Sequence, residues 1–156
     1  MTERPNPSNG YHHEHTEILL SSFRHWTRRD LITTSSDIIS NARTLFTSTT
    51  IVVSHGTEDD PIFNYGNASA LELFELEWDD FTRMPSRKSA EAVNRTQRAT
   101  ILNEVAKNGF SESYAGIRIS ASGRRFQIAD AILWNLLDNE GRYCGQAACF
   151  DQWEYL

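Results

Sequence analysis

Apolar and polar residues follow different periods in the two parts of the chain, which predicts helices first and mostly strands afterwards. Between residues 11 and 33 the apolar residues recur at helical spacing, which is typical of an amphipathic helix. The members of this stripe are Ile18, Leu19, Phe23, Trp26 and Leu31. A second short helix is expected after Asp37, whose side chain can cap its first turn. We therefore expect a helical extension over residues 11–48 behind a disordered tail over residues 1–10.

A strand, a turn and a capped helix are predicted next. The β-branched run at residues 50–53 is typical of a buried strand, and residues 62–63 form a second, shorter one. Asn67 can accept a hydrogen bond from the free amides of a first helical turn. One apolar face then follows at spacings of three and four, made of Leu71, Phe74 and Trp78. A longer helix is predicted between Ser89, a capping residue, and Gly109, and its apolar residues are Val93, Ile101, Leu102 and Val105.

Three further strands are expected to complete the chain. Residues 113–121 contain Ile117 and Ile119 alternating with Arg118 and Ser120, and Ser122-Gly123 is a hairpin turn signal. In the next strand, residues 124–137, the even positions are Phe126, Ile128, Asp130, Ile132, Trp134 and Leu136. A second turn leads into residues 143–150. This order predicts an α+β fold over residues 49–156, with an antiparallel sheet of about five strands and helices packed on one side.

Several short blocks resemble one known family, the MEKHLA domain family, which is related to PAS sensor domains. The blocks are Val53-Ser54-His55-Gly56, Pro61-Ile62-Phe63-Asn64-Tyr65-Gly66-Asn67, Leu73-Phe74, Met84-Pro85-Ser86-Arg87-Lys88-Ser89-Ala90-Glu91, Gly116-Ile117-Arg118-Ile119-Ser120, Ser122-Gly123-Arg124-Arg125-Phe126, Trp134-Asn135 and Asp138-Asn139-Glu140-Gly141. The resemblance extends over most of residues 11–153 and is that of a standalone, bacterial-type member. It implies a PAS-like sensing or interaction module, and it implies no established catalytic residues.

Charge and composition narrow the classes of partner. The formal net charge is −6 and the basic residues are scattered, which argues against a nucleic-acid surface. No apolar run approaches the roughly 20 residues that a membrane span requires, and the polar N-terminus lacks the apolar core of a signal peptide. Cys144 and Cys149 are five residues apart, so on a strand they point to opposite faces and do not form a local disulfide. We expect a cytoplasmic protein.

The sequence names no cofactor. The resemblance to PAS domains raises flavin and haem, but residues 67–105 contain no cysteine for light-oxygen-voltage photochemistry, and residues 89–109 contain no histidine for haem. An unusual haem ligand from elsewhere stays open. Among His12, His13 and His15, the spacing of His12 and His15 could place both on one helical face for a metal, but we favour a solvated helix start.

Eight residues are the candidates for a ligand-binding cleft between the sheet and the helices. The aromatic set that could line it is Phe63, Tyr65, Phe74, Trp78, Phe126 and Trp134. His55 and Asp130 are the polar candidates, because Asp130 interrupts an apolar strand face and would need a partner if it pointed inward. Two interpretations of Asp130 stay open: a polar anchor or acid–base partner of His55, and a β-bulge that turns its side chain outward. For each aromatic, ordinary core packing is the alternative.

The prediction for function is a non-catalytic, PAS-like sensory module. A small ligand would fill the cleft, and its occupancy would change the packing of the N-terminal helices and thereby a partner or homodimer surface. One alternative is a ligand-free association module whose cleft is filled by its own side chains. A second is a small α+β enzyme that uses His55 and Asp130 as an acid–base dyad.

Overall fold

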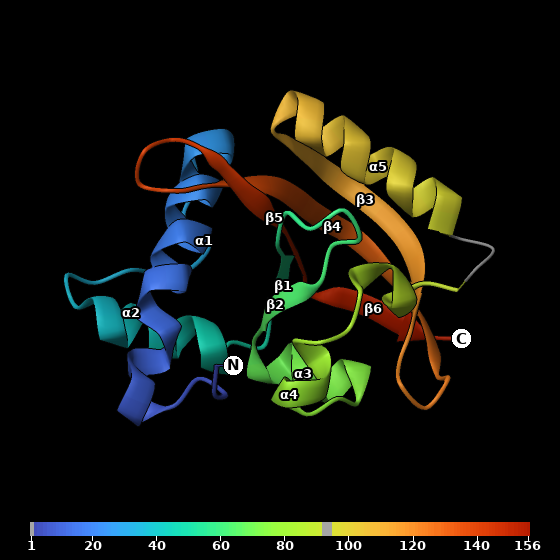
Figure 1. Cartoon of the computed structure of the whole chain (residues 1–156), viewed down its shortest axis with the longest axis horizontal. Coiled ribbons are helices and arrows are strands. Elements are labelled where there is room, and N and C mark those ends of the chain that lie inside the picture. The colour runs from blue at the N-terminus through green and yellow to red at the C-terminus, as the bar shows by residue number, and fades with distance from the viewer. Residues whose placement is uncertain (1, 92–94) are drawn as a thin grey trace.

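The computed structural model describes residues 2–91 and 95–156 as an antiparallel sheet with helices on both of its faces (Figure 1). The strands are β1 (Ile51–His55), β2 (Phe63–Gly66), β3 (Phe110–Ile119), β4 (Arg125–Leu137), β5 (Tyr143–Phe150) and β6 (Gln152–Tyr155). The helices are the 3₁₀ helix η1 (Pro7–His12), α1 (His13–Thr27), α2 (Ile38–Thr47), α3 (Ala68–Phe74), α4 (Trp78–Phe81), the 3₁₀ helix η2 (Ser86–Ser89) and α5 (Arg95–Asn108). The strand order is β2-β1-β5-β4-β3, and β6 continues beside β4. The predicted α+β class and antiparallel sheet are confirmed.

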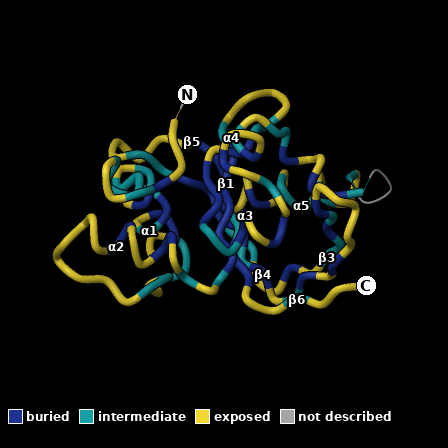
Figure 2. The backbone as a smooth tube through the Cα atoms, turned by 90° about the horizontal axis from the view of Figure 1, so that it is seen from below, coloured by how far each residue is buried: buried dark blue, intermediate teal, exposed yellow. Residues whose placement is uncertain are grey.

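Consecutive residues of β4 show that α1 and α5 lie on opposite faces of the sheet, because neighbouring side chains of a strand point to opposite sides. The Trp134 ring meets the Phe23 ring of α1 edge to face, with centroids 5.0 Å apart. The next side chain, Asn135, donates to the carbonyl of Ala106 in α5 at 3.2 Å. Figure 2 shows the buried backbone of the sheet between these two helical layers. The N-terminal extension therefore packs on the sheet of its own chain.

The N-terminal segment is more ordered than its composition suggests. Residues 2–6 lead into η1, whose first amides are capped by the side chain of Asn6. The carbonyl of Thr2 accepts from Nε1 of Trp78 at 3.2 Å, which ties the segment to α4. The helix itself begins at His13 and ends at Thr27, where Arg28 adopts the left-handed conformation (φ 61°). Local capping and the contact of Thr2 with Trp78 thus give residues 2–10, which we expected to lie in a disordered tail, a defined path.

Asn67 joins the sheet to α3, as its position in the sequence predicts. Its side-chain oxygen accepts from the amides of Ala70 and Val52, both at 3.2 Å. Its amide nitrogen donates to the carbonyls of Leu45 and Thr50, at 3.1 and 2.7 Å. Every hydrogen-bonding position of this fully buried amide is therefore used, and α2, β1 and α3 are fixed relative to one another.

Two bulges reverse the inward-facing side of β4. Between Gly116 and Tyr114 the pairing of β3 with β4 gains one residue on β4, at Asp130, which has φ 53°. The register is restored by an extra residue on β3, Ser113, with φ 61°. Because an extra residue shifts the alternation by one, Ile128 faces the α5 side whereas Ile132 faces the α1 side. The even positions of β4 do not form the single face that their apolar character suggests.

The long helix begins later than Ser89, since this residue closes η2 and α5 starts at Arg95. The expectation that Val93 belongs to the helix lies outside the described residues. Cys144 and Cys149 are free thiols, and burial raises the pKa of Cys149 to about 12. Among residues 2–91 and 95–156, no helix combines the length and the apolar character that crossing a bilayer requires.

Candidate functional site

A cavity of about 50 Å³ lies between the sheet and α5. By the space that one ordered water needs, it has room for about four water molecules or a ligand of a few non-hydrogen atoms. Its apolar lining is Val53, Phe63, Phe74, Leu102, Ile128, Leu133, Ala148 and Phe150. Its polar lining is Ser54, His55, Ser89, Arg98, Tyr114, Arg118 and Gln146, and Ala147 completes the set. A small apolar chamber with a few converging polar groups is the composition of a ligand site.

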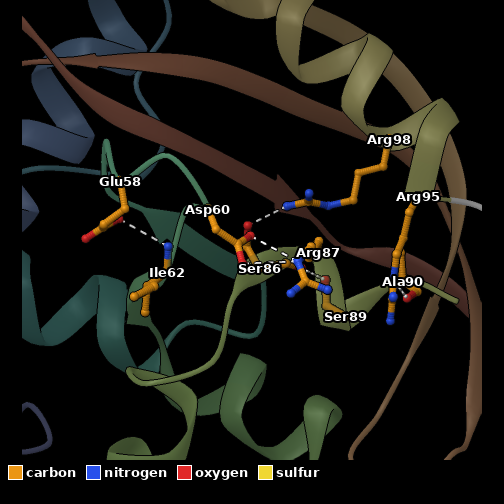
Figure 3. A network of polar contacts seen from close by, with 9 residues as sticks. All are labelled: Glu58, Asp60, Ile62, Ser86, Arg87, Ser89, Ala90, Arg95 and Arg98. Carbon is orange, nitrogen blue, oxygen red and sulfur yellow. Dashed lines mark hydrogen bonds and ion pairs between the residues drawn. The ribbon is translucent and has the colours of Figure 1, made fainter. Parts of the chain in front are cut away.

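Two arginines enter this cavity from different elements. Arg98 extends from α5 and donates to Oγ of Ser86 in η2 at 2.8 Å (Figure 3). Arg118 projects from β3, is only 9% exposed, and donates to the hydroxyl of Tyr114 at 2.9 Å. Burial, and next the positive charge of Arg118, lower the pKa of Arg98 to about 10. The cavity wall therefore concentrates positive charge in a chain that is acidic overall.

His55 forms the opposite wall of the cavity at the end of β1. Its Nδ1 lies 2.9 Å from the carbonyl oxygen of Gly56. A carbonyl only accepts, so Nδ1 has the proton and Nε2 is left as an acceptor. Burial lowers the pKa of His55 most, and the charge of Arg98 acts in the same direction, whereas the Gly56 carbonyl, the charge of Glu58 and the side chain of Gln146 oppose them. Nε2 is buried and, among the described residues, makes no hydrogen bond of good geometry, although the side chain of Gln146 lies on the same cavity wall.

Gln146 and Asn135 connect the cavity to both helical layers. The side-chain nitrogen of Gln146 donates to the carbonyl of Leu102 in α5 at 2.8 Å and to Oδ1 of Asn135 at 3.2 Å. Asn135 in turn donates to α5 on one face, and its main-chain oxygen accepts from Nε1 of Trp26 in α1 at 2.9 Å. A continuous series of hydrogen bonds thus runs from the cavity wall through β4 to α1.

The structure brings three of the eight sequence candidates together at the cavity. His55, Phe63 and Phe74 line it directly. Phe126 is fully buried beside it, with its ring 5.4 Å from that of Phe74. Phe63 also stacks on Phe81 at 4.3 Å, so this aromatic group belongs partly to the core.

The other four candidates lie elsewhere. Tyr65 and Trp78 pack against each other and against His15 and His12 beside the N-terminal helix. Trp134 faces α1 on the other side of the sheet, as its contact with Phe23 shows.

Asp130 is exposed, because the bulge at its own position turns its side chain out of the strand face. It lies in a shallow surface hollow with Arg29 and Cys149, whereas His55 lines the cavity. Of the two interpretations left open for Asp130, the outward bulge is the one observed. The structure does not form the acid–base dyad that the enzyme alternative requires.

Sequence reasoning missed Arg98, Arg118, Tyr114 and Gln146. The alternation in β3 is real, but the buried side is the polar one: Arg118 and Ser120 are buried, and Ile117 and Ile119 are partly exposed. The polar inward face is satisfied in two ways: Arg118 borders the cavity, and Ser120 donates to the carboxylate of Glu75 at 2.6 Å. Two features of the sequence could have indicated these residues. Gln146 interrupts an apolar strand, and the long helix has few apolar residues on its inner face.

The site does not fit the larger PAS cofactors. Its volume is far below the roughly 300–1,000 Å³ of typical cofactor and drug-sized sites. No cysteine is among its lining residues. Elsewhere in the part of the chain that the structure describes, no three His, Cys, Asp or Glu side chains form a metal-binding group. His15 instead bonds Oγ of Ser54 at 2.9 Å.

Comparison with known sequences identifies one family. The model of the MEKHLA domain matches residues 13–155. The homeobox-leucine zipper protein HOX29 of Oryza sativa subsp. indica is 26% identical over 100 residues, which cover 62% of this chain and 11% of that protein. HOX32 of the same subspecies is 22% identical over 137 residues, covering 86% of this chain and 16% of that protein. The chain therefore spans only 11–16% of the length of these curated relatives.

Solved structures show the same fold. The PAS domain of a protein from Colwellia psychrerythraea superposes with a TM-score of 0.63 at 11% identity, covering 77% of this chain and 98% of that domain. An RNA-binding light-oxygen-voltage receptor gives a TM-score of 0.62 at 14% identity, covering 76% of this chain and 34% of the receptor. At these identities the likeness concerns the fold alone, and that fold is the PAS fold.

Proposed function

Because the chain belongs to the MEKHLA domain family and has a PAS fold, we propose that its cavity is a sensory site that binds a small ligand. The module is non-catalytic and cytoplasmic, and it signals by associating with a partner protein or with a second copy of itself. One observation supports the ligand most strongly: Nε2 of His55 is buried in the cavity wall without a partner. A buried polar atom left unsatisfied costs about 1–3 kcal/mol, which a ligand or an ordered water can offset.

The hydrogen bonds around Asn135 give the proposal a route from ligand to partner surface. A ligand that contacts Gln146 alters the position of a side chain that holds both α5 and Asn135. Asn135 also accepts from Trp26, so the same change reaches α1. Behind α1, the residues Ile38 and Ile39 of α2 are 42% and 46% exposed and provide apolar area for association. Ligand occupancy would thus bias the N-terminal layer, as a two-state sensor requires.

Native mass spectrometry on freshly purified, undialysed protein tests the ligand. The wild-type protein is expected to retain an additional small mass that is lost on denaturation. Ala148→Met, which extends a side chain into the cavity, is expected to abolish it. Ala121→Met at an exposed turn position is the matched control and should retain the mass. A clean apo mass for the wild type, unchanged by addition of cell extract metabolites, would contradict the proposal.

A second candidate, a ligand-free association module, is favoured by the small cavity volume of about 50 Å³. In that case the cavity is a packing defect that binds no ligand, and the module acts through its surface alone. The two candidates differ in how association responds to the cavity. Ala148→Met should leave oligomeric state unchanged in an association module but shift it in a ligand-responsive sensor, as measured by analytical ultracentrifugation.

A further inference from the structure

The two cavity arginines have more hydrogen-bond donors than the protein uses. A guanidinium has five N–H donors. Arg98 uses one of them, on Ser86. Arg118 uses two, on the carbonyl of Ile117 at 3.0 Å and on the hydroxyl of Tyr114 at 2.9 Å. Among the described residues, neither arginine forms an ion pair with a carboxylate.

The nearby acidic side chains are already engaged. Asp60, the carboxylate whose charge acts on Arg98, accepts both of its contacts from Nε of Arg87 at 3.1 Å (Figure 3). Glu58 accepts from the amide of Ile62 at 3.1 Å. Arg98 and Arg118 therefore line the same, largely apolar chamber with like charge, an arrangement that is costly unless an anion compensates it.

At His55 the cavity needs a hydrogen-bond donor rather than an anion. Nε2 of His55 is a bare acceptor, because Nδ1 has the proton. The lone pair of Nε2 would repel a carboxylate oxygen, whereas a hydroxyl group could donate a hydrogen bond to Nε2. The remaining lining, which includes Phe74, Ile128 and Leu133, is apolar and accommodates a short carbon chain. The space of about 50 Å³ limits the ligand to a few non-hydrogen atoms.

We infer that the cavity binds a short-chain hydroxycarboxylate, with its carboxylate between Arg98 and Arg118 and its hydroxyl donating to Nε2 of His55. A planar carboxylate suits the guanidinium fork, whose paired N–H groups bind it more specifically than a spherical anion. The Tyr114 hydroxyl, which accepts from Arg118, still has its own proton to donate to the same carboxylate. This inference rests on the proposed function, because it specifies the ligand class of the same site.

Isothermal titration with three matched compounds tests each contact. Lactate contains both groups, propionate lacks the hydroxyl, and lactamide lacks the negative charge. Lactate is expected to bind most tightly. Propionate should bind about 2- to 10-fold more weakly, the effect of one neutral hydrogen bond, and lactamide about 10- to 100-fold more weakly, the effect of charged ones.

Single variants assign the contacts to residues. Arg98→Gln and Arg118→Gln should each weaken lactate binding about 10- to 100-fold. His55→Phe should reduce lactate binding to the level of propionate and leave propionate unchanged. Arg95→Gln is the matched control on the same helix, because Arg95 donates to the carbonyl of Ala90 and does not line the cavity. The Tm of every variant is measured alongside, and if Arg118→Gln does not fold, the less buried Arg98 supplies the test.

Three results would overturn the inference. Equal binding of lactate and lactamide would show that the arginines do not recognise the negative charge. Equal binding of lactate and propionate would show that His55 does not bind the hydroxyl. Tighter binding of nitrate or phosphate than of lactate would show an inorganic anion site instead. If none of the three compounds binds while native mass spectrometry still finds a mass that Ala148→Met removes, the ligand class is wrong and the sensory site stands. If no mass is found either, both fail.

Discussion

The two faces of the sheet differ in how closely they are packed, although they share the same strands. On the α1 face, Trp134 is fully buried against Phe23, and the contact is apolar and closely packed. On the α5 face, Arg98 and Arg118 border a cavity, and the helix is held by hydrogen bonds to its carbonyls as much as by apolar contact. A packed face gives stability, and a face with polar groups and space gives a site. The comparison predicts that packing of α1 contributes more to stability than packing of α5.

Truncating Phe23, which packs α1 against the sheet, should have the largest effect on stability. Phe23→Ala is expected to lower the free energy of unfolding by about 3–5 kcal/mol, because Phe23 is 3% exposed and its loss leaves a cavity. Leu102→Ala on the cavity side should cost clearly less, about 1–2 kcal/mol, since this side chain is partly exposed and already borders empty space. Urea denaturation of both variants measures the difference. Equal costs would contradict the distinction between the faces.

Breaking the connection between the faces should have the next largest effect. Asn135→Ala removes the donor to Ala106 and the acceptor of Gln146, so we expect a loss of about 2–3 kcal/mol from buried groups left without partners. Asn139→Ala, in an exposed turn, is the control and should stay within about 0.5 kcal/mol of wild type. Hydrogen exchange should also report faster exchange in both α1 and α5 for Asn135→Ala. Faster exchange confined to α5 would show that Asn135 does not couple the layers.

Acid should weaken the packing between α1 and the sheet. Burial, and next the charge of His12, lower the pKa of His15 to about 4, from about 6.5 in the unfolded chain. Between these values the unfolded chain binds the additional proton, so stability falls as the pH drops from about 6.5 to about 4, by on the order of 1–3 kcal/mol. His55 adds a change of the same sign, because its pKa is also lowered.

Urea denaturation across this pH range measures the effect. His15→Gln should flatten the slope, whereas His25→Gln, at an exposed position, should not. A wild-type stability that rises toward pH 4 would show that protonated His15 is accommodated in the folded state.

Substitution at the bulge should have the smallest effect. Asp130 has φ 53°, which glycine adopts without strain, so Asp130→Gly is expected to change stability by less than about 1 kcal/mol. Asp130→Val should cost more, because a β-branched residue is strained in this conformation. Neither variant should alter ligand affinity, since Asp130 does not line the cavity. A loss of affinity in Asp130→Gly, measured by titration, would place Asp130 in the site after all.

The sequence predicted the fold more fully than the site because the two depend on different information. Helical periodicity, the Asn67 cap and the turn signals are local, and each of these elements is confirmed. The inward side of β4 depends on a bulge at Asp130 that only the pairing with β3 reveals. Because Arg118 alternates with isoleucines, the sequence pattern assigns it to the polar side of the strand. On a fully packed sheet that side faces solvent. Apolar patterning finds packed cores, and it misplaces residues that surround a polar cavity.

A crystal structure of the protein grown with lactate tests the central claim most directly. We expect planar density in the cavity, within hydrogen-bond distance of Arg98 and Arg118, with a hydroxyl oxygen beside Nε2 of His55. Side chains that fill the cavity, with both guanidinium groups turned toward solvent, would contradict it.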